Sequence, residues 1–114
     1  MRITNETKGT ELANNVRVAR GVWSRTVGLL GKSSLNPGEG LVIEPCTSVH
    51  TAFMRFAIDV LYVDRARKVV KGVANLKPFR VSGVMSGRCS VVELPSGTIA
   101  ASSTAAGDQL AFEP

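Results

Sequence analysis

Short runs of apolar and β-branched residues recur along this chain, and residues that favour turns separate them. Such runs are typical of strands, because branched and aromatic side chains pack well on a pleated surface. They predict six strands, at 16–19, 40–43, 58–63, 68–76, 90–94 and 109–112. The pattern indicates a mainly β protein, a small antiparallel β-sandwich or barrel-like fold with one or two short helices.

One segment has the spacing of a helix. Trp23, Val27 and Leu30 recur at intervals of four and three residues, so they share a face in a helix over 22–30. Gly31 suits the position just after such a helix. The segment 98–105 fits either a short helix or a turn.

Two of the predicted strands form a hairpin. Only residues 64–67 connect 58–63 with 68–76, which is short enough for an antiparallel pair. The period of two places Asp59 on the same face as Leu61 and Val63. Because a lone carboxylate is costly in an apolar environment, we expect Asp59 to be buried with a partner. Arg55, His50 and backbone N–H groups are the candidates.

Length and composition fit a single folded domain over residues 1–114. Of the 114 residues, 44% are hydrophobic and 20% are charged, a balance typical of globular domains. Only the extreme N-terminus is expected to fray. No apolar run approaches the roughly 20 residues that cross a bilayer, and residues 1–8 lack the pattern of a secretory signal. We therefore expect no membrane span and a cytoplasmic location.

The positive charge is concentrated in one part of the chain. The net charge is +5, and half of the 14 Lys and Arg residues lie between Asp64 and Glu93 with no acid among them. This basic segment, 65–88, is compatible with a weak nucleic-acid binder, but a sheet edge protected by Lys and Arg has the same pattern. Only Phe79 could stack on a base there. We favour the sheet edge and expect no specific binding to nucleic acid.

Several separated blocks resemble a known family. Residues 40–64 read GLVIEPCTSVHTAFMRFAIDVLYVD, with GLLG at 28–31 upstream and ELPSGT at 93–98 downstream. In their order and spacing, these blocks are similar to the domain of unknown function 192 family. The resemblance implies a compact β-sandwich or barrel-like fold with short helical insertions, and it implies no established reaction.

The chain departs from the family pattern at a few positions. Ala57 and Ser96 stand where proline and alanine are expected, and Ala66-Arg67 replaces a turn of the Asp-Gly kind. Arg67 lacks the easy access of glycine to positive φ. A longer or strained turn is therefore expected there.

The candidate site is a polar cluster in the middle of the chain. It comprises Cys46, His50, Thr51, Arg55 and Asp59. A structural zinc site usually needs four nitrogen or sulfur ligands, whereas the chain has two cysteines and one histidine. A three-ligand site of Cys46, His50 and Asp59 would require a turn that brings the first two together. We expect no metal and no other cofactor.

The same residues permit other chemistry. Cys46 with His50 as its base would form the thiol–imidazole pair of a nucleophilic enzyme. However, cysteine is among the most commonly buried residues, and we expect Cys46 and Cys89 to be free thiols. Arg55 would either pair with Asp59 in a buried network or, beside a cleft, anchor a small anionic ligand.

No phosphate-binding loop, dinucleotide fingerprint or nucleophile elbow is present. We therefore favour a small non-enzymatic ligand-binding or accessory domain with a polar cluster around His50, Arg55 and Asp59. The alternatives are a small enzyme that uses His50 with Cys46 or Asp59, and a weak nucleic-acid binder through residues 65–88. The distinguishing feature is whether the polar cluster converges at an open pocket or lies sealed inside the fold.

Overall fold

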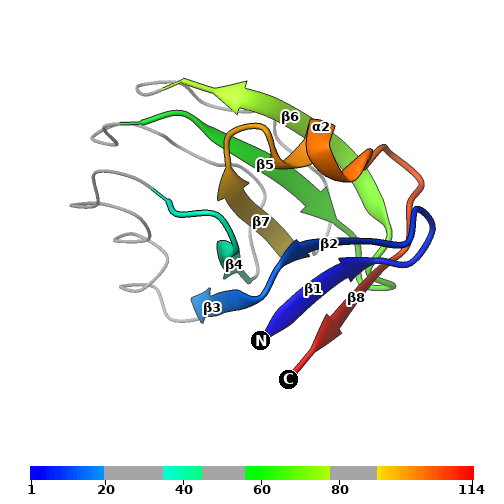
Figure 1. The fold of residues 1–114 in the computed structure, drawn as a ribbon. Helices are drawn as coiled ribbons and strands as arrows, with labels where there is room; N and C mark the ends of the chain where they lie inside the picture. The colour runs from blue at the N-terminus through cyan, green and yellow to red at the C-terminus, as the bar shows by residue number, and fades with distance from the viewer. Residues whose placement is uncertain (20–34, 45–55, 78–89) are drawn as a thin grey trace.

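The computed structural model describes residues 1–19, 35–44, 56–77 and 90–114, which form two β-sheets and one short helix (Figure 1). The strands are β1 (Arg2–Asn5), β2 (Thr10–Ala13), β3 (Asn15–Ala19), β4 (Glu39–Ile43), β5 (Ile58–Val63), β6 (Val69–Leu76), β7 (Ser90–Pro95) and β8 (Leu110–Glu113). The helix is α2 (Thr98–Ser102). The fold is mainly β, as the sequence pattern predicts.

The larger sheet has five strands in the order β3-β4-β7-β5-β6, and the smaller has three in the order β2-β1-β8. All described neighbours are antiparallel except β3 and β4, which run parallel. The sheets are antiparallel as expected, and β3 with β4 is a parallel pair within them. A parallel pair needs a long connection, which the segment between the two strands is long enough to provide. Within the described ranges, neither sheet closes into a barrel.

The main core lies between the two sheets. Figure 1 shows the three-stranded sheet crossing one side of the five-stranded sheet. The buried side chains between them include Ile3, Leu12, Val42, Leu61 and Leu110. Burial of such side chains contributes roughly 1.5–3 kcal/mol each. The packing of the two layers therefore makes a large contribution to the stability of the domain.

The opposite face of the five-stranded sheet is also buried at its centre. Leu41, Ile43, Val60, Tyr62 and Val91 belong to a second apolar cluster on this side. We call it the outer face, because the three-stranded sheet packs on the other side. With both faces covered, β5 is buried at all of its positions, which explains why its sequence is continuously apolar rather than alternating.

The N-terminus is ordered, contrary to the expectation that it frays. β1 is the central strand of the smaller sheet and pairs with β2 and β8. Ile3 and Asn5 are both completely buried. The strand's stability comes from a segment near the other end of the chain, which no local pattern indicates.

The predicted hairpin is confirmed, since β5 and β6 pair antiparallel. Its turn places Arg67 at φ 66°, in the left-handed region that favours glycine. The Arg67 guanidinium donates to Glu44 Oε2 at 3.1 Å and to Ser90 Oγ at 3.0 Å, and it lies 4.2 Å from the centroid of the Phe112 ring. These contacts offset the backbone strain of the turn.

Arg67→Ala should therefore be less stable than Arg67→Gly by about 1 kcal/mol. Both variants lose the guanidinium contacts, but only alanine keeps the cost of positive φ. Urea denaturation of the two variants and the wild type measures this difference. Equal stability of the alanine and glycine variants would contradict the prediction.

Of the two segments expected to contain a helix, the structure describes only one. The segment 22–30 lies outside the described residues. The segment 98–105 contains α2, which ends where Ser103 adopts φ 57°. In the part of the chain that the structure describes, no helix has the length and apolar character needed to cross a membrane.

Candidate functional site

Most of the polar cluster expected from the sequence is not placed by the structure. Cys46, His50, Thr51 and Arg55 lie outside the described residues, as does Cys89. Asp59 is the one member that can be located. Whether the cluster converges at a pocket therefore stays a prediction.

Asp59 is completely buried on β5, as expected. Its carboxylate accepts hydrogen bonds from three backbone N–H groups, those of Asn75 at 2.8 Å, Gly97 at 3.1 Å and Ile99 at 2.8 Å. The N-cap residue of α2, Gly97, has no side chain that could accept from the first turn. Asp59 supplies that acceptor from a neighbouring strand, so its main described contacts tie β5 to β6 and α2.

The sequence analysis did not select Glu93, which the structure places at the centre of the outer face. Glu93 belongs to β7, is 3% exposed, and lies in register with Leu41 on β4 and Val60 on β5. Burial raises the pKa of its carboxyl from 4.5 to about 7. A charged residue within the apolar run 90–94 is the sequence signal that could have identified it.

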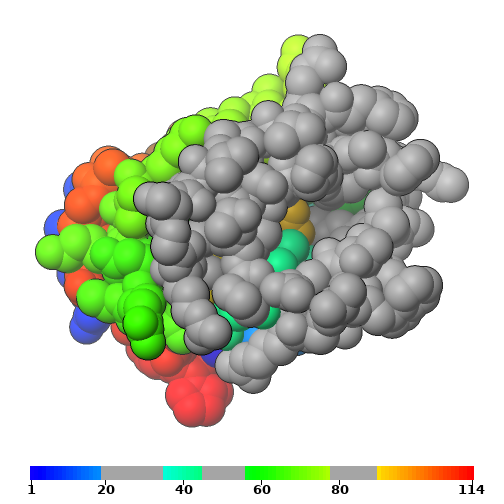
Figure 2. Space-filling view, turned by 180° about the vertical axis from the view of Figure 1, so that it is seen from behind, coloured from blue at the N-terminus to red at the C-terminus, as the bar shows by residue number. Residues whose placement is uncertain are grey.

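No residue in the described ranges forms a hydrogen bond or an ion pair with the Glu93 carboxyl. In those ranges no completely enclosed side-chain oxygen lacks a partner, so the small exposed fraction of Glu93 includes its carboxyl oxygens. Figure 2 shows that atoms of β4 and β7 are visible from this side of the molecule. The carboxyl is therefore largely removed from water but keeps a small solvent-accessible area.

Among the residues that the structure describes, strand register places four other titratable or charged side chains on the outer face, and none of these four pairs with Glu93. Arg17 on β3 is exposed and lies in register with Leu41, and Glu39 on β4 accepts a hydrogen bond from the Asn36 N–H. Tyr62 on β5 is completely buried, and Lys71 Nζ on β6 lies 5.9 Å from its ring centroid.

The chemistry available to Glu93 follows from its pKa. A carboxyl that titrates near neutral pH can accept a hydrogen bond as the anion or donate one as the acid. It can therefore bind a polar group of a ligand on an otherwise apolar surface. In the portion of the chain covered by the structure, no group of three or more metal-ligating side chains comes together.

The described basic residues of the segment 65–88 lie in the β5–β6 turn, on β6 and directly after it. β6 is an edge strand of the five-stranded sheet. This agrees with the interpretation of the segment 65–88 as a protected edge. Arg67 forms an ion pair with Glu44, so part of the positive charge is neutralised within the fold; Arg80 and Arg88 lie outside the described residues.

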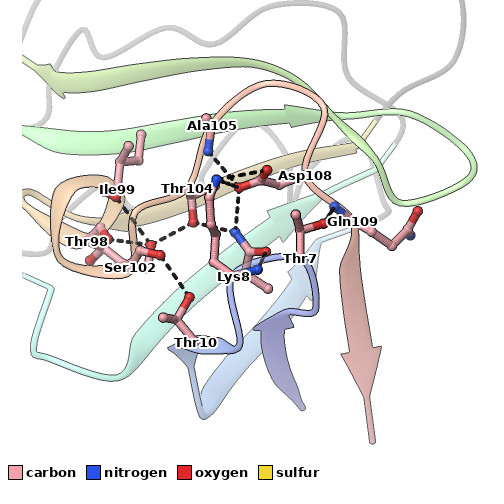
Figure 3. A network of polar contacts seen from close by, with 11 residues as sticks. Thr7, Lys8, Thr10, Thr98, Ile99, Ser102, Thr104, Ala105, Asp108 and Gln109 are labelled. Atoms are coloured by element: carbon pink, nitrogen blue, oxygen red, sulfur yellow. Dashed lines mark hydrogen bonds and ion pairs between the residues drawn. The ribbon is translucent and has the colours of Figure 1, made fainter.

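A second polar cluster surrounds Asp108 (Figure 3). The Asp108 carboxylate accepts hydrogen bonds from Asn5 Nδ2 at 2.9 Å, from Lys8 Nζ at 2.9 Å and from the Ala105 N–H at 3.0 Å. These bonds, with that of Asn5 first, lower the pKa of Asp108 from 3.8 to about 2. The cluster connects the β1–β2 turn to the segment before β8. The Asp108 carboxylate finds its hydrogen-bond donors within the cluster.

Acid should weaken this connection. The folded-state pKa of Asp108 is depressed, so its stabilising contribution is complete above pH 3.8 and is lost as pH falls towards about 2. Asp108→Asn should be less stable than the wild type at neutral pH, and its stability should fall less steeply below pH 3.8. Urea denaturation across this pH range tests the prediction, and identical slopes for the two proteins would contradict it.

Comparisons with known proteins agree on one family. The model of DUF192, described as "Uncharacterized ACR", matches residues 3–112. A UPF0127 protein of Pyrococcus furiosus is 36% identical over 112 residues, which cover 93% of each chain.

Solved structures share the fold. A protein of unknown function from Novosphingobium aromaticivorans has a TM-score of 0.85 at 20% identity, and the match covers 98% of this chain and 84% of that one. A protein of Sinorhizobium meliloti described as a candidate transcription regulator has a TM-score of 0.78 at 19% identity, covering 96% and 89%. The family model extends over nearly the whole sequence, and this chain belongs to the DUF192 family.

Proposed function

We propose that this protein is a small non-enzymatic ligand-binding domain whose ligand contacts the outer face of the five-stranded sheet at Glu93. One observation supports this most directly. Glu93 is almost fully buried, and no described residue forms a hydrogen bond or an ion pair with its carboxyl.

Within the described ranges, the Glu93 carboxyl lacks the hydrogen-bond partner that a buried polar group normally has. Burying a polar group without a hydrogen bond costs roughly 1–3 kcal/mol in proteins, and native folds rarely tolerate this cost without a functional reason. Leu41 and Val60, the cross-strand neighbours, cannot supply a hydrogen bond. A ligand that brings a polar group to Glu93 would offset the cost.

The two buried aspartates in the described ranges, Asp59 and Asp108, do not need a ligand. Asp59 and Asp108 accept several hydrogen bonds from within the protein. Asp59 also lies on the opposite face of β5 from Val60, and therefore on the opposite side of the sheet from Glu93. These contacts weigh against Asp59 as a catalytic partner of His50.

Nucleic acid is a weaker candidate partner. The structural similarity to the candidate transcription regulator of S. meliloti, at 19% identity, concerns the fold alone. We expect weak, salt-sensitive attraction to DNA, because basic side chains without stacking aromatics contact phosphates non-specifically. Fluorescence anisotropy with labelled duplexes of different sequence measures this. Micromolar, sequence-dependent binding that persists at about 0.2 M salt would contradict it.

A fragment screen tests the proposed function. Two-dimensional 15N NMR spectra would be recorded with a library of small amines, carboxylic acids, sugars and nucleotides. We expect at least one compound to bind with a Kd below about 1 mM and to shift amide signals of β4, β5 and β7.

Two variants provide the comparison. Glu93→Gln should weaken the binding, whereas Glu6→Gln, which removes an exposed carboxylate, should leave it unchanged. The absence of any such binder, or shifts confined to other strands, would contradict the proposal.

A further inference from the structure

We propose that the ligand is a small organic cation, an apolar body with one protonated primary amine that pairs with the Glu93 carboxylate. This inference rests on the proposed function and names the chemical class of its ligand.

The charge of the Glu93 carboxylate favours a ligand of opposite charge. A carboxylate in an apolar environment is stabilised most by an opposite charge within about 4–6 Å. Its cross-strand neighbours on β4 and β5 are Leu41 and Val60, and its neighbours along the same face of β7 are Val91 and Pro95. Not one of these four side chains carries a charge, so the compensating cation must come from elsewhere.

Among the described residues, Arg17 and Lys71 are the basic residues that strand register places on the outer face. Each belongs to an edge strand, two strands from β7, which corresponds to about 10 Å between strands. Both are exposed, so water screens their charge. Neither neutralises Glu93, which leaves that role open to a bound cation.

The apolar surroundings of Glu93 favour a ligand with an apolar body. The outer face around Glu93 is formed by Ile43, Ile58, Val91 and the completely buried Tyr62. A bare metal ion would gain nothing from these side chains, and the described residues bring no second oxygen ligand to the carboxyl. An amine on an aliphatic body can reach the carboxylate with one end, and its apolar part is compatible with the apolar environment of Glu93.

The charge of the ligand predicts the pH dependence of binding. A cation binds the ionised form of Glu93, whose pKa is about 7, and a primary amine stays protonated because its pKa is near 10. Affinity should therefore rise roughly tenfold from about pH 6 to about pH 8 and then level off. A ligand that accepts a hydrogen bond from the protonated carboxyl would show the opposite trend.

The experiment compares three probes of matched shape, n-hexylamine, n-hexanol and hexanoate. Isothermal titration and 15N NMR would give the affinity and the location of each probe across this pH range. The proteins are the wild type, Glu93→Gln and the surface control Glu6→Gln. NMR spectra of the free variants check that each is folded. We expect hexylamine to bind wild type and control at least about tenfold more tightly than hexanol at the highest pH.

The outcomes separate the two proposals. In Glu93→Gln, the preference for hexylamine and its pH dependence should disappear while hexanol binding remains. If hexanol or hexanoate binds the outer face as tightly as the amine, the cation is excluded and the ligand-binding function stands. Affinity for the amine that falls with rising pH would also exclude it. If none of the probes binds and the fragment screen finds no ligand, both proposals fail.

Discussion

Asp59→Ala should lower the unfolding free energy by about 3–5 kcal/mol, since hydrogen bonds to a charged group contribute roughly 1.5–3 kcal/mol each and do not add fully. The substitution leaves the N–H groups of Asn75, Gly97 and Ile99 without their acceptor. Two of these groups belong to the N-terminal end of α2. Because small domains are stable by only about 5–15 kcal/mol, the variant is expected to be unfolded or insoluble.

Asp59→Asn should be damaged less. Asp59 Oδ2 accepts from Gly97 and Ile99, and Oδ1 accepts from Asn75. In the asparagine variant, the amide oxygen can replace Oδ2 and accept from Gly97 and Ile99. The amide NH2 group stands in place of Oδ1 and cannot accept the hydrogen bond from Asn75. Urea denaturation would rank the proteins as wild type, asparagine, alanine. Glu6→Ala, at an exposed position, should change stability by less than about 0.5 kcal/mol.

A small effect of Asp59→Ala would have a clear meaning. If the variant melts within a few degrees of the wild type, the three hydrogen bonds contribute little to folding. Asp59 would then return to the group of candidate ligand-binding residues with His50 and Arg55.

Glu93→Gln should be more stable than the wild type at pH 8 by up to about 3 kcal/mol. Burial raises the pKa of Glu93 from 4.5 to about 7, so the folded state retains a proton that the unfolded state has already lost. Between these two values, the unfolding free energy of the wild type falls as pH rises. Above pH 7 the cost of the buried charge is complete, and glutamine avoids that cost.

The pH profile is the measurement that tests this. Unfolding free energies of Glu93→Gln and wild type should converge near pH 4.5 and diverge as pH approaches 7. Glu6→Gln should follow the wild type throughout. Parallel profiles for Glu93→Gln and wild type would show that Glu93 is not the group that titrates.

A stabilising substitution at Glu93 would also be informative about function. Residues that reduce stability persist mainly where an activity requires them. Glu93→Gln should raise stability and weaken the binding of n-hexylamine in the same protein. The two effects together would show that Glu93 is a ligand-binding carboxyl. A gain in stability without a loss of binding would show that it is only an unfavourable core residue.

Local patterns were sufficient for several elements. The hairpin of β5 and β6 could be predicted because a short turn joins two long strand-like runs. The burial of Asp59 followed from the period of two along β5. A longer or strained turn at Ala66-Arg67 was expected because glycine is absent there, and Arg67 adopts a positive φ. Each depends on interactions between residues that are close in sequence.

The candidate site was harder to predict than the strands. The partner of Asp59 was left open among Arg55, His50 and the backbone, and only folding brings Gly97 and Ile99 to it. Glu93 is one acidic residue within an apolar strand. Its lack of a partner depends on β4 and β5, which are far from β7 in the sequence and place Leu41 and Val60 beside it.

The sequence by itself determined six of the eight described strand-forming segments, the β5–β6 hairpin and the family, because propensity, periodicity and turn chemistry act over a few residues. Tertiary structure alone decided that β1 is a central strand, that β3 and β4 run parallel, and that Glu93 is buried among apolar neighbours. The physical reason is that strand pairing joins distant segments, such as Arg2–Asn5 and Leu110–Glu113. The burial and charge environment of a side chain are set by those partners rather than by its neighbours along the chain.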